Sequence, residues 1–294
     1  MDQKTLQWRG YVMILGAAVC WGTMAVVAKL LFRDRGVDPL TLVVVRADLT
    51  ALILLGALVV LRRRDLRIGV RDLGFAALVG LGGLMTNNYL YFLTLSLTGV
   101  ATALLLQYQA PVLVALYTVF VLRQRLSLRL VVALLSALIG CALVVRAYDV
   151  ESLRPNLPGI LAGLGTAVTF AFYILASRAA LQRMTAGTLL TYAYVSAALA
   201  WSAAAPPWQL LARGFPADLW GAFLAIAVFG TVIPFGLFIG GLRFLPAAQA
   251  SIVSMLEPVV AAVVAFLVLG ESLGPPQILG GALVLAGVML VETA

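Results

Sequence analysis

The sequence predicts an all-α integral membrane protein whose ten transmembrane helices form two inverted repeats of five helices each. Three observations predict this fold class. Of the 294 residues, 63% are hydrophobic and 11% are charged, long apolar runs recur along the whole chain, and the second half repeats features of the first. Such a chain cannot cover its surface with polar side chains in water, so the composition excludes a soluble protein.

Ten runs of about 20 mostly apolar residues are each long enough to span a bilayer. They cover residues 10–32, 39–61, 72–97, 99–122, 128–147, 157–181, 187–205, 217–242, 246–269 and 276–292. Pro39, Gly99, Pro216 and Pro246 mark junctions between them. Because the connections are short, we expect consecutive helices to lie antiparallel and side by side.

The distribution of Lys and Arg predicts which face is cytoplasmic, because cationic loops are retained on that side. The N-terminus and the even-numbered loops carry 13 such residues, namely Lys4, Arg9, Arg62, Arg63, Arg64, Arg67, Arg71, Arg123, Arg125, Arg129, Arg178, Arg183 and Arg243. The odd-numbered loops carry five, namely Arg33, Arg35, Arg146, Arg154 and Arg213. Both termini are therefore expected in the cytoplasm.

The net charge of +8 is explained by these topology signals and does not indicate a nucleic-acid partner. Cys20 and Cys141 both lie inside apolar runs, and the chain has no histidine. We therefore expect no disulfide framework, metal site, cofactor or histidine-based catalysis. Residues 1–9 are too short and too polar for a signal peptide, so the first helix is expected to remain as an anchor.

A shift of the chain by 147 residues indicates an internal repeat. It places Pro111 on Pro258 and Gly140 on Gly287, with matching loop positions. The repeats would be residues 1–149 and 150–294. Because five helices are an odd number, the second repeat must start on the opposite face of the membrane, and such inverted repeats typically enclose a substrate site near the midplane and work by alternating access.

Several segments resemble a known family. The segment from Pro39 to Arg46, the segment Ser251–Leu273 (SIVSMLEPVVAAVVAFLVLGESL) and the ILGGALVLAGVMLVE sequence after it resemble the EamA-domain members of the drug/metabolite transporter superfamily. The chain is most similar to the aromatic amino-acid exporters of that superfamily. The resemblance implies export of amino acids or related metabolites. The first unit has Ala110 where the second has Glu257, so the halves are not expected to be chemically equivalent.

Polar side chains inside apolar spans predict a substrate cavity or contacts between helices. In the third span Asn87, Asn88, Tyr91 and Thr94 form one stripe, and the fourth span carries Gln107, Tyr108 and a kinking Pro111. The ninth span carries Ser254, Glu257 and Pro258. The buried carboxyl of Glu257 suits proton-linked transport or recognition of a substrate ammonium group, and its alternative roles are to cap backbone or pair with a structural arginine.

Trp21, Tyr173 and Phe238 lie well inside their spans, away from the interfacial belts where membrane aromatics are common. Together they could form stacking or cation–π walls, although each alone could equally pack against helices or lipid. Lys29, Arg46 and Asp48 lie near the outer ends of the first two spans. We expect Asp48 to pair with Lys29 or Arg46 in a structural role; alternatively, Lys29 meets a substrate carboxylate.

The leading hypothesis is a secondary transporter that exports aromatic amino acids or similar amphiphilic metabolites through the bacterial inner membrane, as a monomer or weak dimer. Its partners would be the lipid bilayer, the small-molecule substrate and, if transport is proton-coupled, protons. Alternative substrates are threonine, homoserine, cysteine derivatives or drugs. An intramembrane enzyme is disfavoured, because Asp48 and Glu257 are the acids clearly inside spans and no nucleophile motif accompanies them.

Overall fold

The computed structural model describes residues 3–98, 100–149 and 156–292, and these residues contain helices and connecting turns but no strands. The helices are α1 (Gln3–Arg35), α2 (Pro39–Leu61), η1 (Arg63–Leu66), α3 (Val70–Leu78), η2 (Val79–Met85), α4 (Thr86–Thr98), α5 (Val100–Gln107), α6 (Ala110–Phe120), α7 (Leu128–Val144), α8 (Leu157–Ala180), α9 (Ala186–Ala204), α10 (Pro207–Ala212), α11 (Ala217–Ala227), η3 (Val228–Val232), α12 (Ile233–Gly241), α13 (Ala247–Ser254), α14 (Glu257–Leu269) and α15 (Pro275–Glu292). Gly99 and Arg154 of the sequence argument lie outside the described residues.

Side-chain caps explain where several helices begin. Asp38, Ser127, Asn156 and Thr185 each accept a hydrogen bond from the backbone N–H three residues later, at the N-termini of α2, α7, α8 and α9. Each cap satisfies a donor that the helix leaves unpaired and contributes about 1 kcal/mol. The caps therefore fix the starts of these four helices at or next to the starts of the predicted spans.

Helices cover all ten predicted spans. Among the described residues, six helices are long and apolar enough to cross a membrane. They are Thr5–Arg35, Pro39–Leu61, Thr102–Phe120, Leu157–Ala180, Ala217–Gly241 and Ala247–Leu269. Leu128–Val144 and Pro275–Val291 are shorter apolar helices, and the other two predicted spans are formed by α3–η2–α4 and α9. The count of ten crossings stays a prediction.

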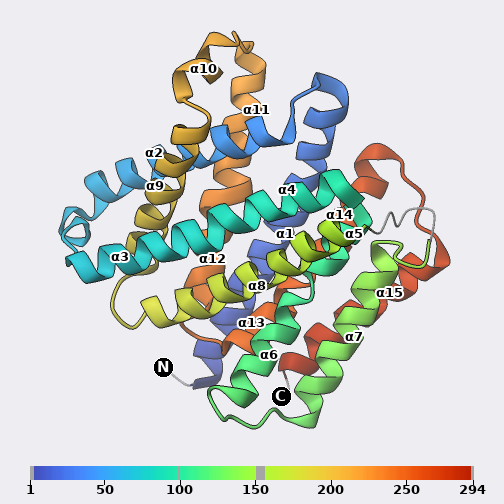
Figure 1. Cartoon of the computed structure of the whole chain (residues 1–294). Helices are drawn as coiled ribbons and strands as arrows, with labels where there is room; N and C mark the ends of the chain where they lie inside the picture. Colours follow the sequence, from blue (N-terminus) through green and yellow to red (C-terminus); the bar gives the residue numbers. More distant parts are fainter. Residues whose placement is uncertain (1–2, 99, 150–155, 293–294) are drawn as a thin grey trace.

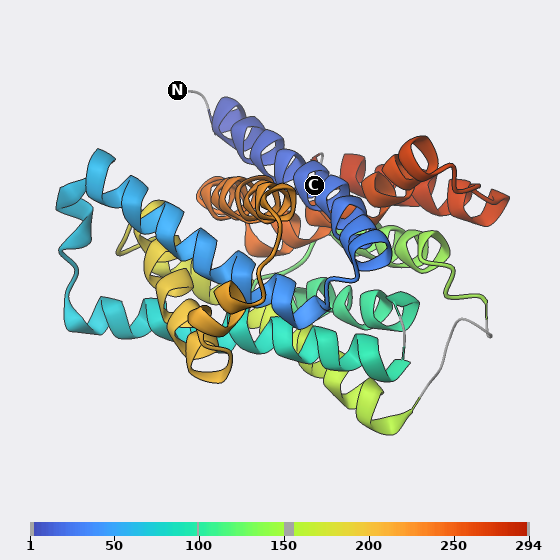
Figure 2. The same cartoon turned by 90° about the horizontal axis from the view of Figure 1, so that it is seen from above.

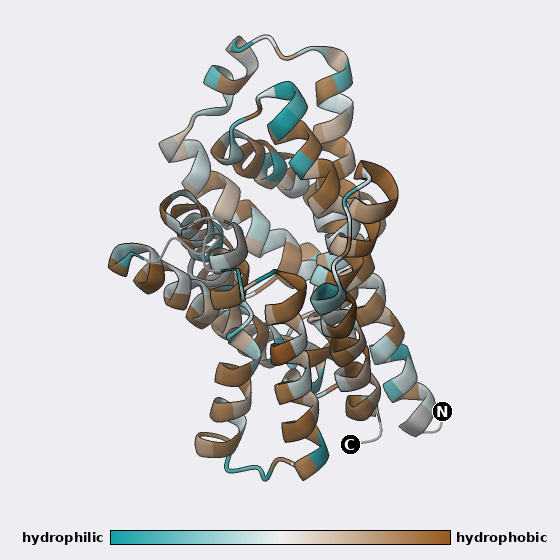
Figure 3. Cartoon of the chain, turned by 90° about the vertical axis from the view of Figure 1, so that its right-hand side faces the viewer, coloured by the Kyte–Doolittle hydropathy of each residue, from teal (hydrophilic) through white to brown (hydrophobic). Residues whose placement is uncertain are grey.

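The surface of these helices is apolar. Side chains such as Val60, Phe120, Leu128 and Leu267 are more than two-thirds exposed, which water would oppose and lipid tails would not. Figure 3 shows hydrophobic residues along most of the helices and hydrophilic residues gathered at helix ends and connections. This distribution is typical of a helical membrane protein.

The connections gather on two sides of the molecule (Figure 1). The chain ends and the α2–α3, α6–α7 and α8–α9 connections lie along the left and bottom, whereas the α1–α2, α4–α5, α9–α11 and α14–α15 connections lie along the top and right. The basic Arg62–Arg71 cluster is thus on the same side as the termini. This grouping is the one that the loop charges predict, although it does not say which side is cytoplasmic.

Two helices are broken at matching places. α5 ends at Gln107 and α6 begins at Ala110, with Pro111 in its first turn. α13 ends at Ser254 and α14 begins at Glu257, with Pro258 in its first turn, so each boundary recurs 147 residues later. Proline cannot continue the hydrogen bonds of the preceding turn, which explains both breaks. The π-helical segments η2 and η3 likewise interrupt the third long helix of each half.

Helices α7 and α15 meet through small residues in an antiparallel pair. A Cβ on Gly140 would lie 2.6 Å from the Gly280 carbonyl oxygen, and a Cβ on Gly287 would lie 2.7 Å from the Ala133 carbonyl oxygen. Between these contacts, Ser136 Oγ donates to the Leu283 carbonyl oxygen at 2.7 Å. Under the shift of 147 residues each contact maps onto the other, and the central one maps onto itself.

The first helix of each half packs against the other half. α1 contacts α12, α13 and α14, whereas α8 contacts α4, α5 and α6. Figure 2 shows α1 lying across the helices near the C-terminal end of the chain. Close approach is possible at Gly22, where a Cβ would lie 2.6 Å from the carbonyl oxygen of Glu257. Because α1 packs against helices of the second half, it lies next to the break before α14.

Candidate functional site

Aromatic side chains from four helices form a cluster inside the molecule. The Trp21 ring lies 5.0 Å from Phe235 and 5.5 Å from Phe238, measured between centroids. Tyr173 lies 5.8 Å from Phe235 and 6.4 Å from Phe238, and Tyr194 lies 5.8 Å from Phe235. The structure therefore brings together the three predicted aromatics, of which Tyr173 and Phe238 are fully buried and Trp21 is partly accessible.

Phe235, Tyr194 and Phe170 belong to this cluster and were not predicted; Phe170 stacks on Tyr173 at a centroid distance of 6.2 Å. Phe235 lies one helical turn before Phe238 in α12, directly after Pro234 and the η3 segment. An aromatic pair at that spacing was a usable signal. Tyr194 in α9 had no such signal, because nothing in its own helix indicates that it faces α12.

Glu257 occupies the first turn of α14, at the break that follows Leu256. Its carboxyl group lies within electrostatic range of Tyr91 of α4, Tyr108 between α5 and α6, and Cys141 of α7. Within the described parts of the chain, no arginine or lysine lies at ion-pair distance from its carboxylate. Pairing with a structural arginine is therefore not what holds Glu257 in the interior.

The polar residues predicted to form one stripe on α4 have two kinds of contact. Some join helices, and others lie near Arg46 or Glu257. Asn87 Nδ2 donates to the Thr166 carbonyl oxygen at 2.9 Å and to Thr169 Oγ1 at 3.3 Å, which ties α4 to α8. Thr94 is buried and donates to its own helix. Asn88 instead accepts a hydrogen bond from Arg46 at 2.9 Å, and Tyr91 lies near Glu257.

The helix breaks place the remaining predicted residues differently. Tyr108 is buried between α5 and α6, whereas Gln107 at the end of α5 is partly accessible. Ser254 is buried, and its hydroxyl donates to the Ser251 carbonyl oxygen at 2.8 Å. That bond satisfies the backbone at the end of α13, so the contact of Ser254 is local to its helix.

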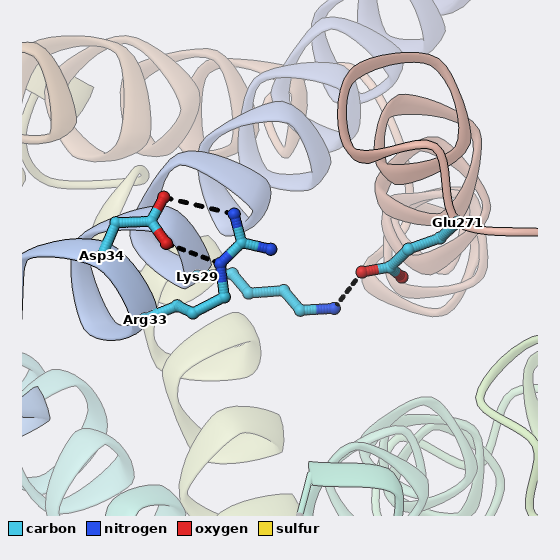
Figure 4. A network of polar contacts seen from close by, with 4 residues as sticks. All are labelled: Lys29, Arg33, Asp34 and Glu271. Carbon is cyan, nitrogen blue, oxygen red and sulfur yellow. Dashed lines mark hydrogen bonds and ion pairs between the residues drawn. The ribbon is translucent and has the colours of Figure 1, made fainter.

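The predicted ion pair between Asp48 and Lys29 or Arg46 is wrong. Lys29 Nζ pairs with Glu271 Oε1 at 2.6 Å, as Figure 4 shows, and Asp48 accepts a 3.5 Å hydrogen bond from Ser202. Arg46 and Asp48 are two residues apart on α2, so their side chains point to different sides of the helix. Lys29 lies near the end of α1, and Glu271 follows the end of α14.

A second polar site lies at the surface between α1, α2 and α11. A pocket of about 250 Å³ there is lined by Arg35, Asp38 and Arg213, among others. Arg35 pairs with Asp218, and Arg213 pairs with Asp38 at 3.4 Å. Partial burial acts to raise the pKa of Asp38, but hydrogen bonds from Thr41 and Arg213 outweigh it and lower that pKa.

Comparison with known proteins decides the family. The model of the EamA-like transporter family matches residues 8–146 and again residues 157–293. The chain belongs to the EamA-like transporter family. This EamA-like transporter is therefore a multi-pass membrane protein, as its apolar helices indicate. The predicted superfamily is confirmed.

The relatives of this EamA-like transporter are transporters too. It is 27% identical over 295 residues to the uncharacterised inner membrane transporter YicL of Salmonella typhimurium, covering 97% of this chain and 95% of the relative. It is 28% identical over 216 residues to the threonine/homoserine exporter RhtA of Escherichia coli, covering 71% and 67%. A crystal structure with 21% identity superposes with a TM-score of 0.77 over 96% of this chain and 95% of the other, which shows the shared fold.

Proposed function

We propose that this EamA-like transporter exports aromatic amino acids, or related small amphiphilic metabolites, from the bacterial cytoplasm across the inner membrane. The observation that carries this proposal is an aromatic cluster around Phe235 together with a carboxylate, Glu257, that no cation of the described residues neutralises and whose backbone lies against Gly22, the neighbour of Trp21 in the cluster. An apolar site with a few orienting polar groups is the usual form of a small-molecule site.

The chemistry of the cluster favours an aromatic substrate with an ammonium group. Partly accessible Trp21 and Phe235 offer ring faces and edges, and a well-placed aromatic pair contributes about 0.5–1.5 kcal/mol beyond its burial. The Glu257 carboxylate would receive the ammonium group. Gly22, next to Trp21, lets α1 approach the backbone of Glu257 at the start of α14.

The fold supports alternating access between two inverted repeats, residues 1–149 and 150–294. The α7–α15 contacts are antiparallel and exchange under the 147-residue shift, as a two-fold axis in the membrane plane requires. Because α1 packs on α12–α14 and α8 on α4–α6, the two rocking bodies would each combine helices from both repeats. In this proposal both termini and the Arg62–Arg71 cluster are cytoplasmic, and the chain works as a monomer or weak dimer.

Threonine and homoserine are the second candidate substrates. The observation that favours them is the similarity to RhtA, whose name states that it exports those two amino acids. They share the ammonium and carboxylate groups of aromatic amino acids but would leave the aromatic cluster unfilled.

The test is counterflow in liposomes that contain the purified transporter and are preloaded with unlabelled amino acid. Radiolabelled Phe and Trp should accumulate at least tenfold faster than Thr and homoserine, and Phe235→Ala should remove that preference. Phe229→Ala is the matched control, because Phe229 is half-exposed and stands outside the cluster. Uptake of Thr and homoserine alone would replace the aromatic proposal with the second candidate, and uptake of no amino acid would refute both.

A further inference from the structure

Arg46 is a cation in the interior that lacks an anion. It lies in α2, where protein surrounds it, and its guanidinium donates to Asn88 Oδ1 at 2.9 Å. Within residues 3–98, 100–149 and 156–292 no carboxylate lies at ion-pair distance from it. By contrast Arg35, Arg183 and Arg213 all meet aspartates, and Arg178 donates to backbone carbonyls. A guanidinium has five N–H donors, so most of those of Arg46 remain available.

One route leads from Arg46 to Glu257 along α4. Asn88, which binds Arg46, and Tyr91, which lies near Glu257, are three residues apart on α4. That spacing corresponds to about one helical turn, a rise of roughly 4.5 Å, and places both side chains on the same face. The partner of the cation, Asn88, and the neighbour of the carboxylate, Tyr91, therefore lie about one turn apart on the same face of α4.

A second route joins the same two residues through the aromatic cluster. Arg46 lies within electrostatic range of Tyr194, whose ring packs against Phe235. Phe235 packs against Trp21, and the adjacent Gly22 contacts the backbone of Glu257. Both routes begin at Arg46 and end at Glu257, and the second passes through the rings of Tyr194, Phe235 and Trp21.

Residues of these two routes keep accessible surface although helices surround them. The partly accessible members are Trp21, Arg46, Asn88, Tyr91, Phe235 and Glu257. A fully packed cluster would leave none of them accessible. Opposite charges that could neutralise one another remain apart, and burying both without partners is costly. A ligand with an anion and a cation of its own would satisfy both.

We infer that Arg46, oriented by Asn88, binds the carboxylate of the transported molecule. The inference rests on the proposed function and narrows its substrate class to zwitterionic α-amino acids, with the ammonium group at Glu257 and the side chain among the rings. Lys29 does not take this role, because Glu271 already neutralises it at 2.6 Å. Amines, amides and esters that lack the carboxylate would be rejected, because the guanidinium would stay unpaired.

The experiment measures competition against radiolabelled Trp counterflow in proteoliposomes, with unlabelled tryptophan and tryptophan amide as competitors. For the wild type, the amide should compete at least tenfold more weakly than the acid. Arg46→Gln should bring this ratio close to one, and Arg46→Lys should retain most of it. Lys29→Gln is the matched control. It removes a different cation, which lies in α1 and already pairs with Glu271, so this variant should keep the wild-type ratio.

A wild-type ratio near one, or an unchanged ratio in Arg46→Gln, would overturn the carboxylate role while leaving amino-acid export intact. If no amino acid is transported, the proposed function fails, and the role of Arg46 is judged by thermal stabilisation of the detergent-purified protein with indole-3-propionate. Stabilisation in the wild type but not in Arg46→Gln would support a carboxylate site. Equal stabilisation of both proteins, or none in either, would refute it.

Discussion

Glu257 and Asp38 are both carboxylates at the start of a helix, and their surroundings give them different roles. Asp38 caps α2, accepts hydrogen bonds from Thr41 and lies beside Arg213 at the surface. Glu257 has no cation at ion-pair distance among the described residues, and it lies in the interior near Tyr91. The first carboxylate stabilises the start of α2, and we propose that the second binds the substrate ammonium group or a proton.

If Glu257 carries a proton during transport, we predict that its replacement by Gln abolishes the pH dependence of transport. A glutamine cannot exchange a proton in the membrane interior, and it loses the charge that would hold an ammonium group, so counterflow should also fall at least tenfold. The measurement is counterflow between pH 5.5 and 8. Glu271→Gln is the control, because Glu271 is an exposed carboxylate paired with Lys29 and should keep the wild-type pH profile. An unchanged profile in Glu257→Gln would leave that residue a structural role.

For Asp38 we predict that replacement by Ala lowers the free energy of unfolding by about 1 kcal/mol at pH 7. Because hydrogen bonds lower the pKa of Asp38 in the folded state, its contribution is present above the unfolded pKa of about 3.9 and is lost as pH falls below it. Thermal unfolding in detergent at pH 7 and pH 3 measures the difference. Ser127→Ala removes a cap that does not titrate, so its effect should be the same at both pH values.

The site could be predicted in part from single residues. Trp21, Tyr173 and Phe238 were found because aromatics deep inside spans are unusual, and they do lie together. The partners of Lys29 and Arg46 could not be found, because Glu271 is 242 residues from Lys29 in the chain and the contact depends on how α1 crosses to the second half. Residue spacing along one helix predicts that polar side chains share a face, but it does not predict which neighbouring helix each side chain contacts. Asn87 contacts α8, whereas the adjacent Asn88 contacts Arg46 of α2.

At the scale of the helices, small residues and interruptions determine how the elements fit. The prolines predicted the breaks at Gln107 and Ser254, and the caps explain the starts of α2 and α7. The π segments η2 and η3 were not predicted, because an extra residue in a turn has no strong signature in the sequence. They rotate α4 and α12 relative to the turns before them, and thereby set which face carries Tyr91 or Phe235.

For the α7–α15 pair we predict that Gly140→Val destabilises the protein by roughly 1–3 kcal/mol, because the new Cβ would lie 2.6 Å from a backbone oxygen that cannot move aside freely. Thermal unfolding in detergent is the measurement. Gly56→Ala in α2 is the control: nothing lies within 4 Å of its added Cβ, so stability should stay the same or rise. Equal stability of Gly140→Val and the wild type would show that the two helices can separate without cost.

At the scale of the whole molecule, ion pairs join helices that are distant in the sequence on both sides. Lys29 and Glu271 join α1 to the end of α14, and Arg183 and Asp72 join α8 to α3 on the side of the termini. These pairs are exposed, so each contributes at most about 1 kcal/mol. Pairs of that strength can bias which side is closed, yet they can separate during a transport cycle.

We predict that the side of the molecule with the Arg62–Arg71 cluster faces the cytoplasm. In a background with Cys20 and Cys141 replaced by Ala, a cysteine at Arg63 should react with an impermeant maleimide only after the cell is opened. A cysteine at Arg213 should react in intact cells, because its loop lies on the opposite side (Figure 1). The reverse labelling pattern would invert the predicted topology and the proposed direction of export.

The α7–α15 contact is symmetric about its centre. Ser136 meets its own counterpart position, Leu283, and the flanking glycine contacts exchange around it, which is the form of an isologous interface between two identical subunits. A surface of this kind is complementary to itself. The architecture is therefore compatible with descent from a five-helix ancestor that assembled as a homodimer with its two copies inserted in opposite directions. Residues 1–149 and 156–294 produced as separate polypeptides should still associate.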